Sequence, residues 1–176
     1  MANREALREL QSRLATRMQA ARAEGVQASW LAVECAGTNY LFPLAQAGEI
    51  FPYTATQHVP YTRPWFLGVA NLRGGLFGVV DLAGFVGARR PEPQTEAGRA
   101  ESRLVALGAT LEVNCALLID RLAGLRNRAA FTASAEPAEG APAWQGPSYT
   151  DANGAVWQEI NLQSLSQQPE FLSISA

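Results

Sequence analysis

Apolar residues follow two different periods along this chain. Over residues 4–23 they recur every three or four positions, which is the period of an α-helix. From Trp30 onward they gather in short runs separated by glycine and proline, a pattern typical of β-strands joined by turns. The sequence therefore predicts one N-terminal helix followed by an all-β body.

The predicted helix carries a single apolar stripe, formed by Leu7, Leu10, Leu14, Met18 and Ala21. Its arginines fall mostly on the other faces, and Gly25 is a typical C-terminal stop. The stripe has two interpretations that the sequence leaves open. The helix docks on the β-body, or it binds a partner or a second copy of itself.

The predicted strands cover residues 30–35, 40–44, 46–51, 65–69, 76–82, 103–108, 114–119, 122–125 and 155–162, and a short helix is expected near 162–165. Two segments near 88–102 and 134–148 are expected as surface loops, because proline and glycine interrupt any regular pattern there. Many short strands with frequent turns indicate a barrel or a sandwich. The expected organisation is a helix over 1–25, a β-body over 26–170 and a tail over 171–176.

Composition narrows the possible function classes. The 176 residues are 48% hydrophobic and 17% charged, with a net charge of −2, and all 14 basic residues are arginine. A folded domain of this size needs neither disulfides nor a structural metal. No long basic run is present, which argues against nucleic-acid binding as the main activity.

Residue types that catalysis or metal binding requires are scarce. The one histidine is His58, and the two cysteines, Cys35 and Cys115, form no CxxC pair, so neither a zinc site nor a nucleophile–histidine centre is predicted. Asp81 and Asp120 follow apolar strands without beginning a D-[TS]-G loop, so we expect them to cap turns. Glycine motifs for dinucleotides or phosphates are also missing from the sequence. The sequence predicts a chain that is not an enzyme and takes no cofactor or metal.

Signals for membrane insertion or export are missing from the sequence as well. There is no apolar run of about 18 residues and no apolar signal core near the N-terminus. We therefore expect a cytoplasmic protein, not inserted directly in a membrane, whose cysteines stay reduced.

The most informative stretch is GVANLRGGLFGVVDL, residues 68–82. It predicts a strand, a tight turn and a second strand, with Asn71 and Gly74 suited to positive φ in the turn. Turn geometry explains the glycines but does not explain Arg73, which is expected to project from the turn. Arg73 is therefore a binding candidate.

This stretch resembles the signature of the CheW-like coupling domains, G-V-x-N-L-R-G followed by apolar residues and V-D-L. Upstream, residues 40–50 are similar to a family segment that ends in V-x-E-[IV]. Downstream, residues 118–125 are similar to the V-D-x-V-x-x-V strand of the family, and residues 157–165 to its terminal strand and D-L-x-x-L. The Arg-rich N-terminal helix, residues 124–127 and the W-x-E-I-N-L ending resemble the PilI-type branch, which serves twitching motility by type IV pili.

The resemblance, which covers about residues 28–166, implies two SH3-like five-stranded barrels with a shared apolar interface, plus the N-terminal amphipathic helix. It also implies a non-enzymatic cytoplasmic adaptor, or scaffold, for chemotaxis-type signal transduction. Family members couple the cytoplasmic hairpin tip of a methyl-accepting chemoreceptor to a histidine kinase, whose regulatory domain is itself CheW-like. Receptor binding in the family uses the groove between the lobes, and position by position this implies Leu44, Ala47, Glu49, Gly68 and Arg73.

A helical tip that docks in a groove needs a small apolar floor and a charged rim. We expect Leu44 to supply the floor and Glu49 and Arg73 to fix orientation at the rim. Gly68 leaves room for the close approach of a backbone.

Some residues depart from the family pattern. Ala47, Ala70 and Gly78 are smaller than the residues usual there, so the groove is expected to be shallower or suited to a different receptor. Asn161 replaces the usual aspartate, a change expected to be structural.

Two other hypotheses remain open at this point. In one, a small β-barrel recognises a peptide, a ligand or single-stranded nucleic acid through a stacking face that consists of Trp30, Tyr40, Phe42, Tyr53, Tyr61, Trp65, Phe66 and Phe77. Nucleic-acid affinity would fall steeply with salt, whereas docking of an apolar hairpin would not. In the other, the chain has the same fold but acts as a competing or alternative coupler.

Overall fold

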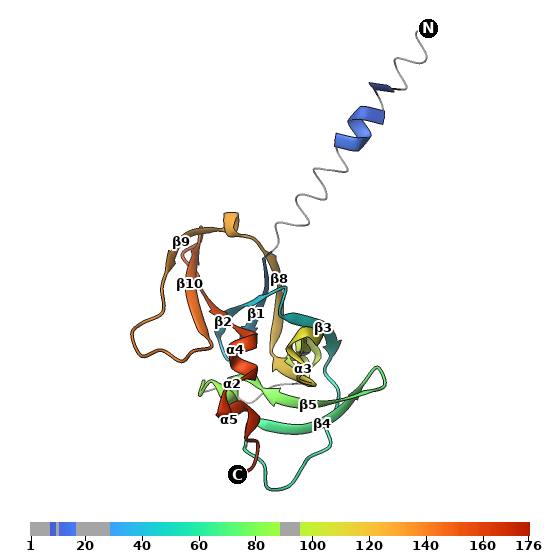
Figure 1. The fold of residues 1–176 in the computed structure, drawn as a ribbon, viewed down its shortest axis with the longest axis vertical. Helices are drawn as coiled ribbons and strands as arrows, with labels where there is room; N and C mark the ends of the chain where they lie inside the picture. Colours follow the sequence, from blue (N-terminus) through green and yellow to red (C-terminus); the bar gives the residue numbers. More distant parts are fainter. Residues whose placement is uncertain (1–7, 10, 17–28, 89–95) are drawn as a thin grey trace.

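The computed structural model describes residues 8–9, 11–16, 29–88 and 96–176 and is mostly β (Figure 1). Its strands are β1 (Trp30–Cys35), β2 (Thr38–Pro43), β3 (Ala47–Pro52), β4 (Phe66–Leu72), β5 (Gly75–Asp81), β6 (Arg103–Leu107), β7 (Cys115–Ile119), β8 (Arg121–Arg126), β9 (Phe131–Ala135), β10 (Gln145–Asp151) and β11 (Val156–Ile160). Its short helices are α2 (Leu82–Phe85), α3 (Glu96–Glu101), η1 (Ala109–Leu111), η2 (Arg128–Ala130), α4 (Leu162–Ser166) and α5 (Pro169–Leu172).

The strands form two sheets, each of which defines one lobe. The six-strand lobe has the order β8-β1-β2-β11-β10-β9, and the five-strand lobe has the order β3-β6-β7-β5-β4. Two pairs are parallel, β11 with β2 and β5 with β7, while the remaining pairs are antiparallel. Because β1 and β2 belong to one lobe and β3 to β7 to the other, the chain enters the second lobe and then returns to the first.

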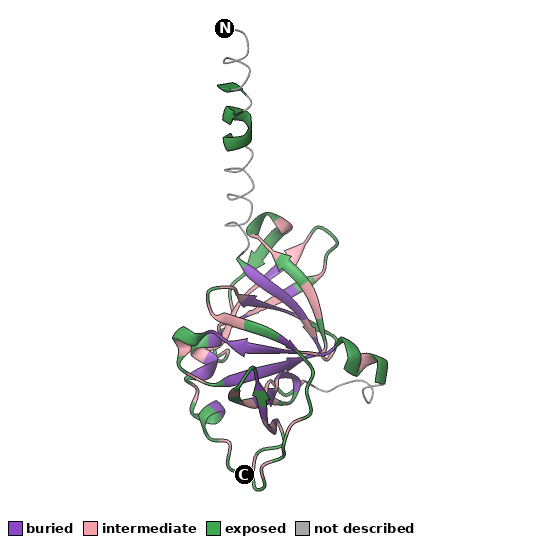
Figure 2. Cartoon of the chain, turned by 90° about the vertical axis from the view of Figure 1, so that its right-hand side faces the viewer, coloured by how far each residue is buried: buried purple, intermediate pink, exposed green. Residues whose placement is uncertain are grey.

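Buried residues form one core inside each lobe and a larger core between the lobes. Alternation along β1 shows how the lobes share it: Trp30 and Ala32 face the core of the six-strand lobe, whereas Leu31 and Val33 face the core between the lobes. The same alternation runs along β7, whose residues from Cys115 to Ile119 face the core between the lobes and the core of the five-strand lobe in turn. This strand is therefore buried on both faces. Figure 2 shows these buried strands in the middle of the molecule. The expected two-lobe fold with a shared apolar interface is confirmed.

The strand expected over 76–82 is present as β5, which ends one residue earlier at Asp81, and the next four residues form α2. Two other local predictions were wrong. Within the loop expected over 88–102, residues 96–101 form α3, whose residues are mostly exposed. The loop expected over 134–148 contains the end of β9 and the start of β10, so the six-strand lobe has one strand more than a five-stranded barrel. These elements lack a strong apolar period, which is the signal that sequence analysis uses.

The N-terminal helix falls largely outside the described residues. Arg8, Glu9 and residues 11–16 are helical and exposed, and Arg13 pairs with Glu9 at 2.9 Å. Leu14 of the predicted apolar stripe is 52% exposed. The other stripe residues and Gly25 lie outside the described residues, so the role of this helix stays a prediction.

Residues 171–176, expected as a tail, pack against the loop before β4. Phe171 is buried between Trp65 and Phe85, with ring centroids 6.3 and 5.3 Å away. Beyond it, the Arg63 amide donates to the carbonyl of Ile174 at 2.7 Å, and the amide of residue 176 donates to the carbonyl of residue 61 at 3.0 Å. The segment therefore holds residues 61–63 through backbone hydrogen bonds.

Candidate functional site

Arg73 lies at the tip of the hairpin that joins β4 and β5. Leu72 pairs with Gly75, and both turn residues have positive φ, 48° for Arg73 and 80° for Gly74, as a two-residue hairpin of right-handed twist requires. Asn71 contributes a hydrogen bond instead of a positive φ, since its Oδ1 accepts from the Gly74 amide at 2.9 Å. The turn thus fixes the backbone of Arg73 while its side chain stays 77% exposed.

Glu49 comes from β3, at the opposite end of the strand order from β4, yet it meets Arg73. Its Oε1 lies 2.5 Å from Nη1 of Arg73, and the Glu49 side chain is 43% exposed. Phe51 and Phe77 come from the same two parts of the lobe, with ring centroids 6.3 Å apart. An ion pair this exposed adds only about 0–1 kcal/mol to stability. Its main effect is to hold two opposite charges at one place on the surface.

Leu44 and Ala47 lie elsewhere, at the junction of the lobes. Both are half-buried and pack against the core between the lobes. Residues 44–49 therefore run from the inter-lobe core, where Leu44 and Ala47 pack, to the exposed ion pair of Glu49.

Gln46, which the sequence did not single out, fixes this junction. Its Oε1 accepts from the amide of Leu162 at 2.8 Å, at the first turn of α4. Its backbone carbonyl accepts from the amide of Gly108 at 2.8 Å, just after β6. One residue thereby ties the β2–β3 connection to both lobes. A glutamine in a short connecting segment gives no sequence signal for such a role.

Gly68 is buried, and its own chain fills the space above it. A Cβ at Gly68 would lie 2.1 Å from the carbonyl oxygen of Gln57, and its φ is +129°. Gln57 and Val69 exchange two backbone hydrogen bonds of 2.8 and 2.9 Å across this contact. The close backbone approach expected at Gly68 is therefore made by the preceding loop of the chain itself.

Two exposed apolar residues accompany the charged pair. Ile50, next to Glu49 in β3, is 37% exposed, and Leu76, paired with Asn71 in the hairpin, is 63% exposed. Neither was singled out from the sequence, because an apolar residue in a strand is normally assigned to the core. Ile50 and Leu76 are thus exposed apolar residues of the same two segments as the charged pair, β3 and the β4–β5 hairpin.

The predicted stacking face is not formed. Among those aromatic residues Trp30, Tyr40, Phe42 and Phe66 are buried, and only Tyr53 and Tyr61 are exposed. The two exposed rings lie in the loop before β4, whereas the buried ones belong to three different strands. Core packing therefore accounts for most of these rings.

Cys115 and Asp120, two of the residues considered for chemistry, both have structural surroundings. Burial raises the pKa of the Cys115 thiol to about 12, so it is not a thiolate at neutral pH. Asp120 accepts a hydrogen bond from the Ala36 amide at 2.8 Å, as expected for a turn-capping aspartate. No cluster of three potential metal ligands occurs among the described residues, and His58 is exposed. In the same residues no helix has the length and hydropathy that a membrane span requires.

Comparison with known proteins agrees with this architecture. A family model of the CheW-like domain matches residues 29–170, which is most of the chain. The chain belongs to the CheW-like domain family.

Two known proteins that this chain resembles provide more detail. Protein PilI of Pseudomonas aeruginosa is 27% identical over 161 residues, which cover 88% of this chain and 85% of PilI. The crystal structure of the scaffolding protein TtCheW from Thermoanaerobacter tengcongensis matches with a TM-score of 0.65 at 16% identity, over 82% of this chain and 95% of that one. At this identity the second match concerns the fold. The CheW-like resemblance and its two-lobe architecture are both confirmed.

Proposed function

We propose that this chain is a non-enzymatic adaptor that couples a methyl-accepting chemoreceptor to a chemotaxis-type histidine kinase. The observation that carries the proposal is the match of the CheW-like domain to the whole β-body, residues 29–170. The similarity to PilI supports a place in the control of twitching motility by type IV pili. The proposal puts the chain on the cytoplasmic side, where the receptor hairpin tip and the kinase meet.

The receptor surface in this proposal is built around the Glu49–Arg73 pair. A guanidinium has five N–H donors, so Arg73 keeps donors free for a partner while one nitrogen contacts Glu49. Ile50 in β3 and Leu76 in the β4–β5 hairpin are exposed apolar residues of the same two segments, so a helical hairpin with apolar and charged side chains has both kinds of residue to contact there. In this proposal Leu44, Ala47 and Gly68 do not contact the partner at the ion pair but position the segments next to it.

In this proposal the coupling domain spans residues 26–170, and residues 1–25 lie outside it. Residues 171–176 belong structurally with the coupling domain, since Phe171 is part of the core between the lobes. The kinase regulatory domain binds a different part of the surface, so that both partners are held together.

The proposal is tested by calorimetric titration of the full chain with two partners in separate experiments. One is a fragment of the cytoplasmic hairpin of a receptor, and the other is the regulatory domain of the kinase. We expect each to bind with a Kd of about 1–100 µM, and binding of the hairpin to change little with salt. If the chain bound the kinase domain but not the receptor fragment, the proposed receptor role would be wrong while the fold assignment would stand. Absence of binding to both partners would contradict the coupling function.

A further inference from the structure

The outer edge of β9 has no strand partner among the described residues. β9 is last in the order of the six-strand lobe and pairs only with β10. Residues 132–135 are all exposed. Figure 1 shows β9 at the margin of the six-strand lobe. An unpaired strand edge offers a row of N–H and C=O groups to any second strand.

The other three sheet edges are protected in ways that β9 is not. β8 carries Arg121 and Arg126 and a register shift opposite β1, and β3 contains Glu49 and ends at Pro52. β4 is covered by the backbone hydrogen bonds of Gln57. β9, in contrast, has the sequence FTASA, without a charge or a proline. Its one irregularity is the register shift near residue 132, and the ladder with β10 is regular from residue 133 to 135. Charge, proline and cover are the usual protections of edges, so β9 is the edge left open to pairing.

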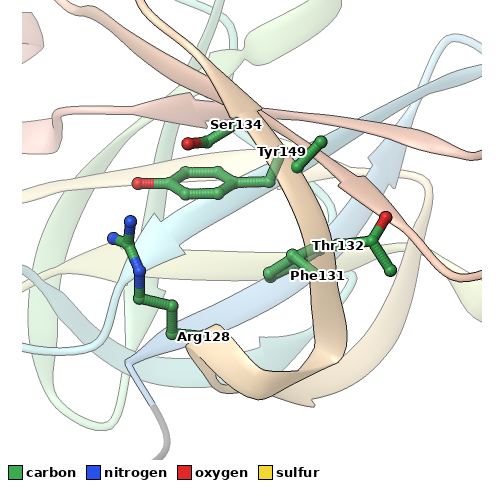
Figure 3. Close-up of a pocket in the computed structure, with 6 residues that line it drawn as sticks. Arg128, Phe131, Thr132, Ser134 and Tyr149 are labelled. Atoms are coloured by element: carbon green, nitrogen blue, oxygen red, sulfur yellow. The ribbon is translucent and has the colours of Figure 1, made fainter.

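Charges of opposite sign flank this open edge. Arg128 lies just before β9 and Glu136 just after it; both are exposed, and neither has an ion-pair partner in the described part of the chain. Next to β9 is a shallow hollow of about 170 Å³, lined by Arg128, Tyr149 and residues 131–134. Figure 3 shows the Arg128 guanidinium and the Ser134 and Tyr149 hydroxyls on the same side of β9.

We propose that β9 of a second copy of this chain occupies this edge, antiparallel to the first and related to it by a two-fold axis. In that arrangement the Arg128 end of one strand lies beside the Glu136 end of the other. The hollow next to β9 of each copy then receives the Glu136 side chain of the other copy. A parallel arrangement would place Arg128 beside Arg128, which is unfavourable. Two-fold symmetry gives two identical contacts between Arg128 of one copy and Glu136 of the other, because the same patch of each copy faces its partner.

The pairing is expected to be weak. A five-residue strand buries less surface than the standard protein interface of about 1,600 Å², so we expect a dimer with a Kd of about 100 µM. This self-association does not depend on receptor coupling. It adds a contact between neighbouring copies wherever the local concentration of the chain is high.

Sedimentation velocity over about 10–500 µM measures the dimer directly. We expect wild type to shift from monomer toward dimer over this range. Thr132 is midway between Arg128 and Glu136, so Thr132→Lys places two like charges opposite each other at the two-fold axis and should raise the Kd at least about tenfold. Thr110→Lys, the same change at an exposed position in η1, outside β9, is the matched control and should leave the Kd unchanged.

A charge exchange tests the antiparallel arrangement itself. Arg128→Glu should weaken the dimer, and the double variant Arg128→Glu/Glu136→Arg should restore it, because each pair again has opposite signs. Thermal unfolding of each variant shows that the monomer is intact. A wild type that stays monomeric, a dimer indifferent to Thr132→Lys, or a double variant that is no better than Arg128→Glu would each overturn the proposal. Hydrogen exchange gives a further check. The proposal would also be overturned if the kinase domain protected the β9 amides from exchange and a rise in the concentration of the chain did not.

Discussion

Replacing Gly68 with alanine should lower the free energy of unfolding by about 2–4 kcal/mol. The new Cβ would lie 2.1 Å from the carbonyl oxygen of Gln57, a distance that no relaxed contact allows, and a φ of +129° is unfavourable for any side chain. The structure relieves the clash only by moving the loop away from β4 and giving up the two hydrogen bonds between Gln57 and Val69. Urea denaturation followed by tryptophan fluorescence measures the loss.

Gly37→Ala is the matched control for this prediction. Gly37 also has positive φ, +75°, but a Cβ at this position would have no other atom within 4 Å. It should therefore lose only the conformational part, about 1 kcal/mol. If the two variants were equally stable, the close approach of Gln57 would not be the reason for glycine at position 68. Hydrogen exchange should in addition show faster exchange at the amides of Gln57 and Val69 in Gly68→Ala alone.

Arg73→Glu should weaken binding of the receptor hairpin fragment by at least about 30-fold while the chain stays folded. The substitution removes the donors of the guanidinium and sets a second carboxylate beside Glu49. A neutral ion pair is thereby replaced by two adjacent negative charges. Stability changes little, because the ion pair is exposed and contributes little to folding. Calorimetric titration gives the affinity, and thermal unfolding checks the fold.

Two variants make the Arg73 result specific. Arg128→Glu carries the same change of charge in the other lobe and should bind the fragment as wild type does. Glu49→Arg/Arg73→Glu restores an ion pair with its signs exchanged, and should fold normally yet still bind poorly, because the partner meets reversed charges. Affinity within about threefold of wild type for Arg73→Glu would mean that the receptor surface lies elsewhere on the molecule.

The strands that the sequence predicted best are those buried on one or both faces. β1 and β7 have long apolar runs because each contributes to its own lobe and to the core between the lobes. β9 has a weaker signal: only Phe131 packs against the core, with its ring 5.8 Å from that of Trp30, while the following residues are small and exposed and are held as a strand by pairing with β10. Residues 174–176 likewise contact residues 61–63 through backbone hydrogen bonds, and the pattern of side chains in a sequence does not predict such bonds.

For the candidate site, local geometry was predictable and contact across the fold was not. The hairpin around Arg73 follows from its turn residues, although the positive φ fell on Arg73 instead of Asn71. The meeting of Glu49 with Arg73 depends on how the five-strand lobe brings its end strands together, and only the family resemblance had grouped these residues. The contact of Gly68 with Gln57 could not be predicted for a different reason. Gln57 lies in an irregular loop, and no periodic pattern places such a loop on a neighbouring strand.

A coupling function requires that this chain link the kinase to the receptor, which a sedimentation assay measures directly. Vesicles that contain the full receptor are mixed with the kinase, with and without the chain, and the kinase that sediments with the vesicles is measured. We expect the chain itself to sediment with the vesicles, the sedimented kinase to rise several-fold when the chain is present, and Arg73→Glu to remove most of this rise. Equal amounts of sedimented kinase with and without the chain would contradict a coupling function.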